Sequence, residues 1–292
     1  MENHGTMIYL FIVSFIWAFS FGLIKGNLTG LDSGFVAFSR MLIAFALFAP
    51  FMRLKSLDPI TLLKLFCIGA IQFGVMYVTY IYSYQFLQAH QVALYTIFTP
   101  LYVTLINDML DRTLRARFLL TSALAILGAY IIVKTDLLRF EVRAGFLLLQ
   151  VSNICFALGQ VLYKKELARN AKLRDRHVFG ILYLGALVIT ACFSAATTNF
   201  SELRLTTTQT ATLAYLGLLA SGLGFFLWNV GARKTRTSTL AIFNNLKVPL
   251  AVACSIFVFH EQGDVKKLLI GGGCMVAALF LNDYLCRDQG KN

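Results

Sequence analysis

The sequence has few charged residues, and acidic ones are the scarcer kind. Asp, Glu, Lys and Arg make up 14% of the 292 residues, whereas hydrophobic residues make up 58%. This balance excludes an ordinary soluble domain, in which about a quarter of the residues are charged. The chain has 14 Asp and Glu against 26 Lys and Arg. Since long stretches carry no charge at all, we expect the chain to lie in a lipid bilayer.

The sequence also lacks the usual signatures of catalysis. It has no G-x-S-x-G or H-E-x-x-H motif, no Gly-rich phosphate loop and no pair of aspartates within an apolar stretch. The six cysteines include no C-x-x-C pair, which argues against a disulfide or a metal site. We therefore expect no catalytic residue, no metal and no cofactor, and rank a membrane-embedded enzyme or a scaffold well below other functions.

What the sequence does contain is a series of long apolar windows. A helix that crosses the roughly 30 Å hydrocarbon core needs about 20 residues. The windows are continuous rather than alternating, which favours helices over barrel strands. They predict an all-α integral membrane protein with ten transmembrane helices, at Met7 to Ile24, Ser33 to Met52, Leu63 to Leu87, Gln91 to Asn107, Phe118 to Val133, Ala144 to Tyr163, Val178 to Thr197, Ala211 to Val230, Thr237 to Phe259 and Leu268 to Tyr284.

Turns and orientation follow from the polar residues. The run from Leu65 to Asn107 has no charge and is too long for one crossing, so we place a turn at Gln88, His90 and Gln91. With the N-terminus inside, the cytoplasmic segments hold 17 of the 26 Lys and Arg residues and the opposite segments hold seven. The positive-inside rule therefore puts both termini in the cytoplasm. Basic residues spread over short loops in this way predict no nucleic-acid partner.

The chain divides into two halves with matching features. Pro100 and Pro249 lie in the fourth and ninth predicted spans, and each is followed by a polar connection and a span with small residues. We divide the chain at residues 1–134 and 135–292. Five spans per half is an odd number, so the second half must be inverted relative to the first. Inverted repeats place a small-molecule substrate near the membrane midplane and favour a transporter that works by alternating access.

Motifs along nearly the whole chain resemble the EamA family of the drug/metabolite transporter superfamily. In the first half they are IWAFSFGLIK, FSRMLIAFALF, IFTPLYVTLINDMLDRTL and ALAILGAYIIV. In the second half they are ICFALGQVLYKK, LASGLGFFLWNVGARK and NNLKVPLAVACSIFVFHEQ. The resemblance implies solute transport across the cytoplasmic (inner) membrane, with export more usual than import. It does not specify the substrate.

The chain departs from the family pattern at three places. The Gly-Glu pair common after the fourth and ninth spans is replaced by Leu110-Asp111 and His260-Glu261. The residue two before the ninth-span proline is Lys247, where relatives often have an apolar or acidic residue. Lys247 is the most individual feature of the sequence.

Lys247 lies 11 residues after Arg236, roughly 16 Å from the cytoplasmic boundary at about 1.5 Å per residue. An ammonium at that depth costs about 2.5 to 3.5 kcal/mol on insertion scales. The sequence offers no carboxylate at that depth to offset this cost, since the Asp and Glu residues fall in loops or at span ends. Three explanations stay open: a neutral lysine, a lysine that faces a wet cavity, and a lysine that binds an anionic substrate.

A further group of residues is predicted to line the substrate site with Lys247. Arg40 is the second cation within a span, either a ligand of the substrate or a structural residue that bonds neighbouring helices. Asn244 shares the helix face of Lys247, and a polar stripe of Gln150, Asn153, Gln160 and Lys164 follows one face of the sixth span. This stripe either lines a cavity or bonds helices together. The remaining candidates are aromatic: Trp17, Trp228 and Tyr80.

Simpler interpretations compete for some of these positions. Tyr77, Tyr80 and Tyr84 approach the outer interface, where an aromatic belt is normal. Gly217 and Ser221 form a small pair typical of close helix packing.

The leading hypothesis is a secondary transporter of a small anionic or zwitterionic metabolite, such as an amino acid or a carboxylate. Phosphorylated metabolites rank lower, because they would recruit more than two buried cations. Amphipathic drugs are the other alternative. The expected partners are the substrate and the lipid bilayer, and a monomer is plausible.

Overall fold

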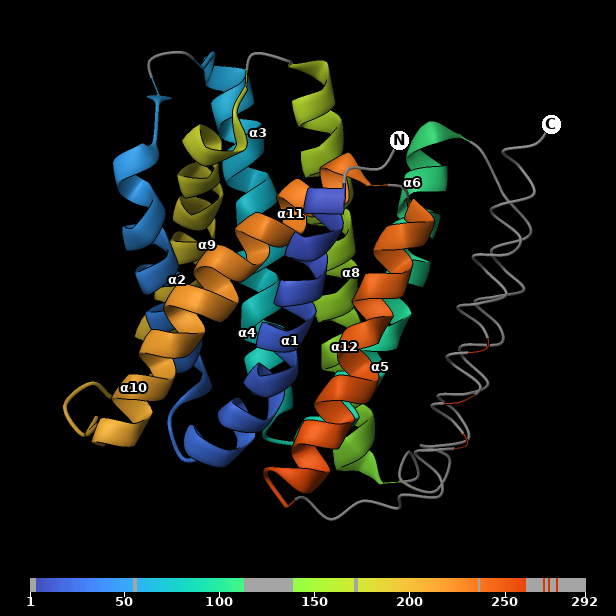
Figure 1. The fold of residues 1–292 in the computed structure, drawn as a ribbon. Helices are drawn as coiled ribbons and strands as arrows, with labels where there is room; N and C mark the ends of the chain where they lie inside the picture. Colours follow the sequence, from blue (N-terminus) through green and yellow to red (C-terminus); the bar gives the residue numbers. More distant parts are fainter. Residues whose placement is uncertain are drawn as a thin grey trace.

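A computed structural model describes residues 4–54, 57–112, 139–170, 173–235 and 237–260, with residues 270, 273 and 277. Within these ranges the structure is helical (Figure 1). The α-helices are α1 (His4–Asn27), α2 (Ser33–Phe48), α3 (Pro59–Gly69), α4 (Met76–Ser83), α5 (Ala89–Tyr95), α6 (Thr99–Asp111), α8 (Phe140–Arg169), α9 (Asp175–Thr197), α10 (Thr207–Tyr215), α11 (Gly224–Lys234) and α12 (Thr237–Phe257). Four shorter helical segments are η1 (Ala49–Phe51), η3 (Ala70–Val75), η4 (Thr96–Phe98) and η5 (Leu216–Leu223).

Several of these elements join into longer membrane spans. Seven helical segments in the described part of the chain are long and apolar enough to cross a membrane: Met7–Asn27, Ser33–Phe51, Pro59–Ser83, Ala89–Asp111, Phe140–Arg169, Asp175–Thr197 and Thr207–Lys234. Each overlaps a predicted span, and the predicted ninth span coincides with α12. The predicted spans Phe118 to Val133 and Leu268 to Tyr284 lie outside the described residues, apart from residues 270, 273 and 277. The part of the chain that the structure describes is all-helical, as expected of an integral membrane protein.

Polar residues at the ends of the spans act as helix caps. Asp32 accepts a hydrogen bond from the Phe35 backbone N–H, 3.0 Å away, and begins α2. Asp58 accepts one from Thr61 at 2.9 Å, which holds the pKa of Asp58 below its usual value. The Gln91 side chain accepts from the Gln88 backbone at the start of α5. Gln88 and Gln91 therefore cap the start of α5, where backbone groups of the first turn lack partners within the helix. The chain turns between α4 and α5 at these residues, which confirms the turn predicted between the third and fourth spans.

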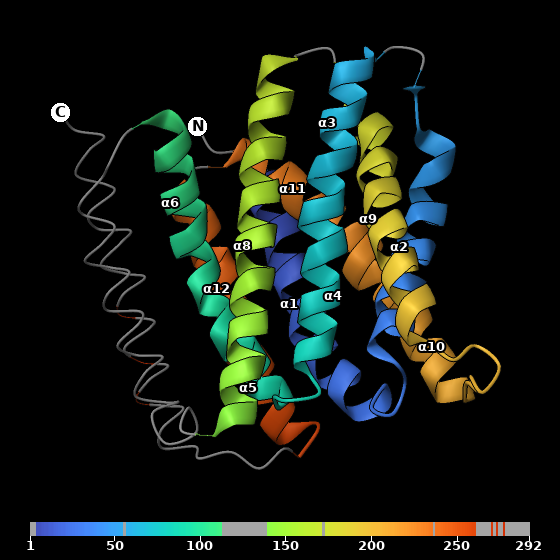
Figure 2. The same ribbon diagram turned by 180° about the vertical axis from the view of Figure 1, so that it is seen from behind.

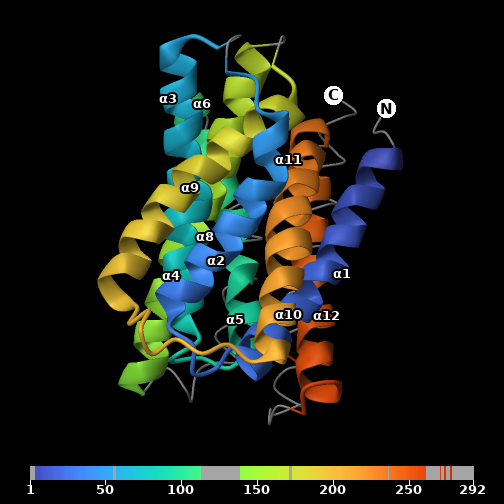
Figure 3. The same cartoon turned by 90° about the vertical axis from the view of Figure 1, so that its left-hand side faces the viewer.

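The helices form one bundle, and α1 lies at its surface, where Phe11, Ile12 and Phe15 are exposed. In Figure 1, α1 lies between α11 and α12, and it packs against both. Figure 3 shows α2 beside α9, which is its main neighbour. Two glycines let α3 and α9 approach each other closely. A Cβ on Gly69 would lie 2.0 Å from the Leu182 carbonyl oxygen, and one on Gly185 would lie 2.1 Å from that of Phe66. Any larger residue there would force these helices apart.

Two spans are interrupted by π-helical segments that the sequence does not predict. Segment η3 lies between α3 and α4, and η5 lies between α10 and α11. The backbone carbonyls of η5 bond to side chains from neighbouring helices. Trp17 donates to the Ala220 carbonyl at 2.9 Å, and Tyr183 donates to the carbonyls of Ser221 and Gly222 at 2.6 and 2.8 Å. A π turn disrupts the regular ladder of backbone bonds, and these donors help to stabilise it.

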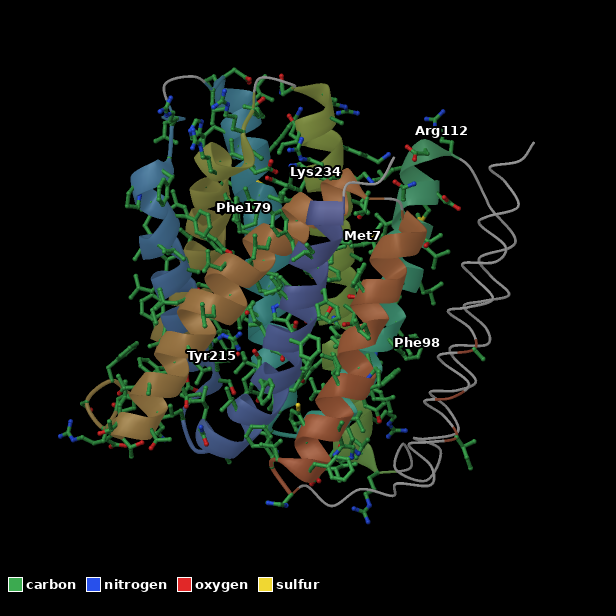
Figure 4. The ribbon with its side chains drawn as sticks, viewed as in Figure 1. Met7, Phe98, Arg112, Phe179, Tyr215 and Lys234 are labelled. Carbon is green, nitrogen blue, oxygen red and sulfur yellow. The ribbon has the colours of Figure 1, made fainter. Side chains whose placement is uncertain are left out.

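The two ends of the bundle differ in charge. Arg112 and Lys234 lie toward one end, whereas Tyr215 lies toward the other (Figure 4). Both basic residues belong to segments that the charge count assigns to the cytoplasm. The division into two inverted repeats and the cytoplasmic location of the termini stay predictions from the sequence.

Candidate functional site

A cavity of about 70 Å³ lies among the helices of the bundle. It has room for a few water molecules, each of which needs about 10 to 15 Å³ by this measure. Its walls come from α1, α2, α4, η4, α6, α8, α11 and α12. The lining residues are Trp17, Ser20, Phe21, Arg40, Met76, Tyr77, Tyr80, Thr96, Thr99, Ser152, Asn153, Phe156, Phe225 and Lys247. We call this the central cavity.

Lys247 reaches the central cavity from α12. Its side chain is buried, and its Nζ donates one hydrogen bond, to Asn244 Oδ1 at 3.1 Å. The same Nζ lies 5.2 Å from the centre of the Trp17 ring, within the range of a cation–π contact. None of the described residues that line the cavity is Asp or Glu. An ammonium group has three N–H donors, so Lys247 retains donors for a ligand.

Arg40 reaches the same cavity from α2, but it is tied to its neighbours. Its Nε donates to Ser221 Oγ at 3.1 Å, and its Nη2 donates to the Tyr77 hydroxyl at 2.8 Å. The Tyr77 and Ser221 oxygens are also 2.8 Å apart, which closes a three-membered network. The guanidinium carbon lies 4.7 Å from the centre of the Tyr77 ring. Arg40 therefore joins α2, α4 and η5, while its buried Nη1 has no partner among the described residues.

Aromatic rings form one wall of the central cavity. Trp17 packs against Phe225 and Phe156, with ring centres 5.0 and 6.1 Å apart, and against Trp228 at 4.9 Å. The Trp17 indole N–H is already bonded to the Ala220 carbonyl. Its ring face, rather than its N–H, is thus what Trp17 offers to a ligand. Such a wall suits a flat or apolar part of an organic molecule.

A second, smaller cavity of about 10 Å³ lies beside the first. Thr99 lines both cavities. The other residues around the small cavity are Pro100, Val103, Gln160, Trp228, Leu240 and Asn244. Gln160 Oε1 accepts a hydrogen bond from Trp228 Nε1 at 2.9 Å. This space lies next to Lys247, because Asn244 is the residue to which Lys247 is bonded.

The residues predicted for the site lie together in the structure. Lys247, Arg40, Trp17, Asn153 and Tyr80 line the central cavity, as predicted from their positions in the spans. Their role in binding stays a prediction.

The other three candidates, Asn244, Gln160 and Trp228, line the small cavity. Contacts between helices far apart in the sequence thus gather all eight into one region.

The polar stripe on α8 combines both of its proposed roles. Gln150 accepts a hydrogen bond from the Tyr102 hydroxyl at 3.1 Å. Asn153 donates to the Tyr95 carbonyl at 2.9 Å and accepts from Thr99 at 3.2 Å. These bonds join α8 to the span formed by α5, η4 and α6. Asn153 also lines the central cavity, but its bonds to the protein make it more of a structural residue than a free ligand.

One interpretation of the aromatic residues is wrong. Tyr77 is not part of an interfacial belt: it is 2% exposed and bonded to Arg40. Ser221 is likewise more than a small packing residue, because it accepts from Arg40. No pattern in the sequence predicts this network, since its members are separated by up to 181 positions.

Thr99 and Ser152 are cavity residues that sequence reasoning missed. Two neighbouring residues could have indicated these positions: Pro100, directly after Thr99, and Asn153 of the polar stripe, directly after Ser152.

Comparison with known proteins identifies the family. The model of the EamA-like transporter family matches this chain twice, over residues 4–134 and 143–282. The chain belongs to the EamA-like transporter family. The predicted resemblance is therefore confirmed, and the protein is a multi-pass membrane transporter rather than an enzyme.

Several curated relatives cover almost the whole of this EamA-like transporter. It is 37% identical over 278 residues to a probable biotin transporter of Pseudomonas aeruginosa, which covers 94% of this chain and 97% of that protein. It is 35% identical to a biotin transporter of Salmonella typhimurium and 34% identical to one of Escherichia coli, each covering 94% of this chain and 92% of the relative. These relatives support transport of a small metabolite.

A solved structure shares the fold of this transporter. It matches with a TM-score of 0.74 at 13% identity, over 98% of this chain and 99% of that one, and its title says only that it is the crystal structure of a protein. At 13% identity the match supports a shared fold and nothing about function.

Proposed function

We propose that this transporter moves a small monocarboxylate of the biotin type across the cytoplasmic membrane, with the carboxylate bound by Lys247. The observation that carries the proposal is a buried lysine, Lys247, that lines a cavity with no Asp or Glu among its described lining residues. Three relatives named for biotin transport supply the chemical type, since biotin bears a single carboxylate on a flexible chain.

The unpaired charge gives the site its selectivity. A buried ammonium without a counter-ion is unfavourable, and a bound carboxylate offsets that penalty by a charge-assisted hydrogen bond. Lys247 keeps donors for this purpose because Asn244 is its one acceptor among the described residues. A neutral analogue of the same shape would leave the lysine uncompensated. Charge, rather than shape alone, is thus the expected basis of recognition.

The cavity favours a monocarboxylate over the other predicted substrates. An amino acid also carries an ammonium, which Lys247 and Arg40 would repel and which no Asp or Glu among the described lining residues would hold. A phosphate group carries close to two negative charges and three acceptor oxygens, whereas Arg40 is already bonded to Tyr77 and Ser221, which leaves Lys247 as the less constrained cation of the cavity. Amphipathic cationic drugs meet the same repulsion as an amino acid's ammonium.

The rest of the substrate has a matching surface. The fused rings of biotin have apolar faces that suit the wall of Trp17, Phe156 and Phe225. The urea of biotin needs both donors and acceptors. The hydroxyls of Thr96 and Ser152 line the same cavity and donate to the carbonyls of Ala93 and Met76, so their oxygens can accept from the urea N–H groups. Arg40 adds the donor Nη1, which is buried and has no partner among the described residues.

Transport requires the cavity to change size. A volume of about 70 Å³ holds a few waters but not a molecule as large as biotin. The aromatic wall must therefore separate when the substrate enters, as alternating access between two packed arrangements demands. Export, which the family resemblance favours, stays a prediction about direction.

Ligand-dependent thermal stability of the purified protein tests the proposal, because a ligand that binds the folded state raises the melting temperature. We expect biotin to stabilise the parent and biotin methyl ester, which lacks the charge, to have little effect. Lys247→Met should lose the response to biotin. Lys164→Met is the matched control, since Lys164 lies on α8 and lines neither cavity.

Equal stabilisation by the acid and the ester would contradict the role of charge. Stabilisation by other monocarboxylates but not by biotin would retain the site and reject the biotin type. Counterflow of labelled biotin in proteoliposomes then measures transport without assuming its direction.

A further inference from the structure

A second large hollow lies away from the central cavity, between α3, α6 and α8. Its volume is about 400 Å³, several times that of the central cavity. Figure 2 shows α8 between α6 and α3 across the back of the bundle. The hollow lies at the end of the bundle where α3 begins and where α6 and α8 end. By the charge count this is the cytoplasmic end. We call this hollow the α3–α8 groove.

The groove is apolar at depth and basic at its rim. On the first wall, Lys64 lies near the start of α3, and Cys67, Ile68 and Ile71 follow at helical spacing. These positions share one helix face, so the wall changes from charged to apolar as it enters the membrane. Lys64 and Cys67 are both exposed on this face.

The opposite wall, formed by α8, also changes from apolar to charged, but here the apolar residue comes first in the sequence. Leu162 is the deepest lining residue of α8, and Lys165, Glu166 and Arg169 follow toward the helix end. They too recur at spacings of three and four, which places them on one face. The two walls therefore bring their charges to one level and their apolar side chains to another. Leu110 of α6, 48% exposed, completes the apolar part.

The charges of the groove leave one cation in excess. Lys64 Nζ lies 3.7 Å from Glu166 Oε2, and Lys165 pairs with Asp111. Arg169 lines the rim and is in no ion pair with the described residues. Among the described residues the groove thus has a guanidinium without an ion-pair partner at the rim of an apolar hollow. A guanidinium binds phosphate through paired N–H donors.

We propose that the α3–α8 groove binds an anionic phospholipid of the cytoplasmic leaflet, with its phosphate at Lys64 and Arg169 and an acyl chain against Ile68 and Leu162. A phosphodiester headgroup with one negative charge matches the single excess cation. Basic hollows between transmembrane helices at the cytoplasmic side are suited to such headgroups. This site is separate from the substrate site and does not depend on the proposed substrate.

The test uses delipidated full-length protein in a neutral detergent and follows thermal stability during lipid titration. Phosphatidylglycerol should stabilise the parent, and phosphatidylcholine and inorganic phosphate should not. Lys64→Gln combined with Arg169→Gln should weaken the apparent affinity for phosphatidylglycerol about tenfold, because each basic residue near the surface contributes to anionic-lipid binding. The control is Arg174→Gln combined with Arg176→Gln, which removes equal charge from the start of α9, outside the groove. It should stay within about twofold of the parent.

Several results would overturn the proposal. Equal stabilisation by phosphatidylcholine would show that the groove does not distinguish anionic from zwitterionic headgroups. Equal stabilisation by inorganic phosphate would assign the groove to a soluble anion, and an equal loss in both double variants would show a general effect of charge. If native mass spectrometry gave a dimer with no retained lipid, the groove would be an interface between copies.

A second variant leaves the charges unchanged. Cys67→Trp places a bulky ring against the apolar wall and should also weaken phosphatidylglycerol binding. It decides the question if the charge variant fails to fold. Unchanged lipid affinity in Cys67→Trp would contradict the placement of the acyl chain.

Discussion

Arg40 and Lys247 carry the same charge at the wall of the same cavity, yet their surroundings differ. Arg40 is bonded to both Tyr77 and Ser221 and lies against the Tyr77 ring. Lys247 has one hydrogen-bond partner in the part of the chain that the structure describes, Asn244. A buried cation held by several neighbours is part of the framework, whereas one with spare donors is available to a ligand. The comparison therefore separates Arg40, which mainly joins helices and keeps only Nη1 for a ligand, from Lys247, which is mainly a residue of the site.

Removal of the Lys247 charge should have the largest effect on function. We expect Lys247→Met to weaken binding of the carboxylate substrate about 100-fold, since the loss of one partner of a buried charge pair costs several kcal/mol. The substrate-free melting temperature should stay equal or rise, because an uncompensated buried charge is removed. Titration calorimetry and thermal melting check both parts. A large drop in the melting temperature would show that Lys247 is structural as well.

A carboxylate placed beside Lys247 should pair with its ammonium, so that Lys247, like Arg40, is held by neighbouring side chains. In Asn244→Asp the new carboxylate would lie where Asn244 Oδ1 now lies, 3.1 Å from Nζ. It would compete with the substrate and weaken binding about tenfold. Asn244→Ala should have a smaller effect, and unaltered binding in Asn244→Asp would contradict the role of the free ammonium.

Substitution of Arg40 should act on stability first. Arg40→Lys keeps the charge but loses the fork that reaches Tyr77 and Ser221, so we expect a loss of about 1 to 3 kcal/mol in the free energy of unfolding. Denaturation of the substrate-free protein measures this loss. An unchanged stability together with abolished substrate binding would reverse the assigned roles of Arg40 and Lys247.

The smallest effect is expected from the partners of Arg40. Tyr77→Phe should lower stability by about 0.6 to 1.5 kcal/mol, because a single hydrogen bond within a membrane bundle is modest. Its effect should be less than additive with that of Arg40→Lys, since both changes break the same bond. A double-mutant cycle measures the difference, and strict additivity would argue against the network. Tyr82→Phe is the control, because Tyr82 is exposed and lies outside the network.

Much of the fold could be predicted because a chain that crosses lipid must satisfy its backbone hydrogen bonds within helices or closed barrels. Apolar windows of sufficient length identified each span that the structure describes, and the turn at Gln88 to Gln91 was visible as a polar cluster. Lys247 stood out because a charge within an apolar run needs a reason. The two π segments were not predicted, since side-chain donors from other helices, such as Trp17 and Tyr183, bond to the carbonyls of η5.

The sequence by itself determined that this chain spans a membrane by helices, that it resembles EamA transporters, and that Lys247 and Arg40 lie within spans. These conclusions depend on local composition and spacing, which are set along the chain. Only the tertiary structure decided that Arg40 is bonded to Tyr77 and Ser221, that Lys247 is not paired with a carboxylate among the described residues, and that basic ends of α3 and α8 meet over an apolar groove. The physical reason is that hydrogen bonds and charge pairs act over a few ångströms in space, between residues that the chain order keeps far apart.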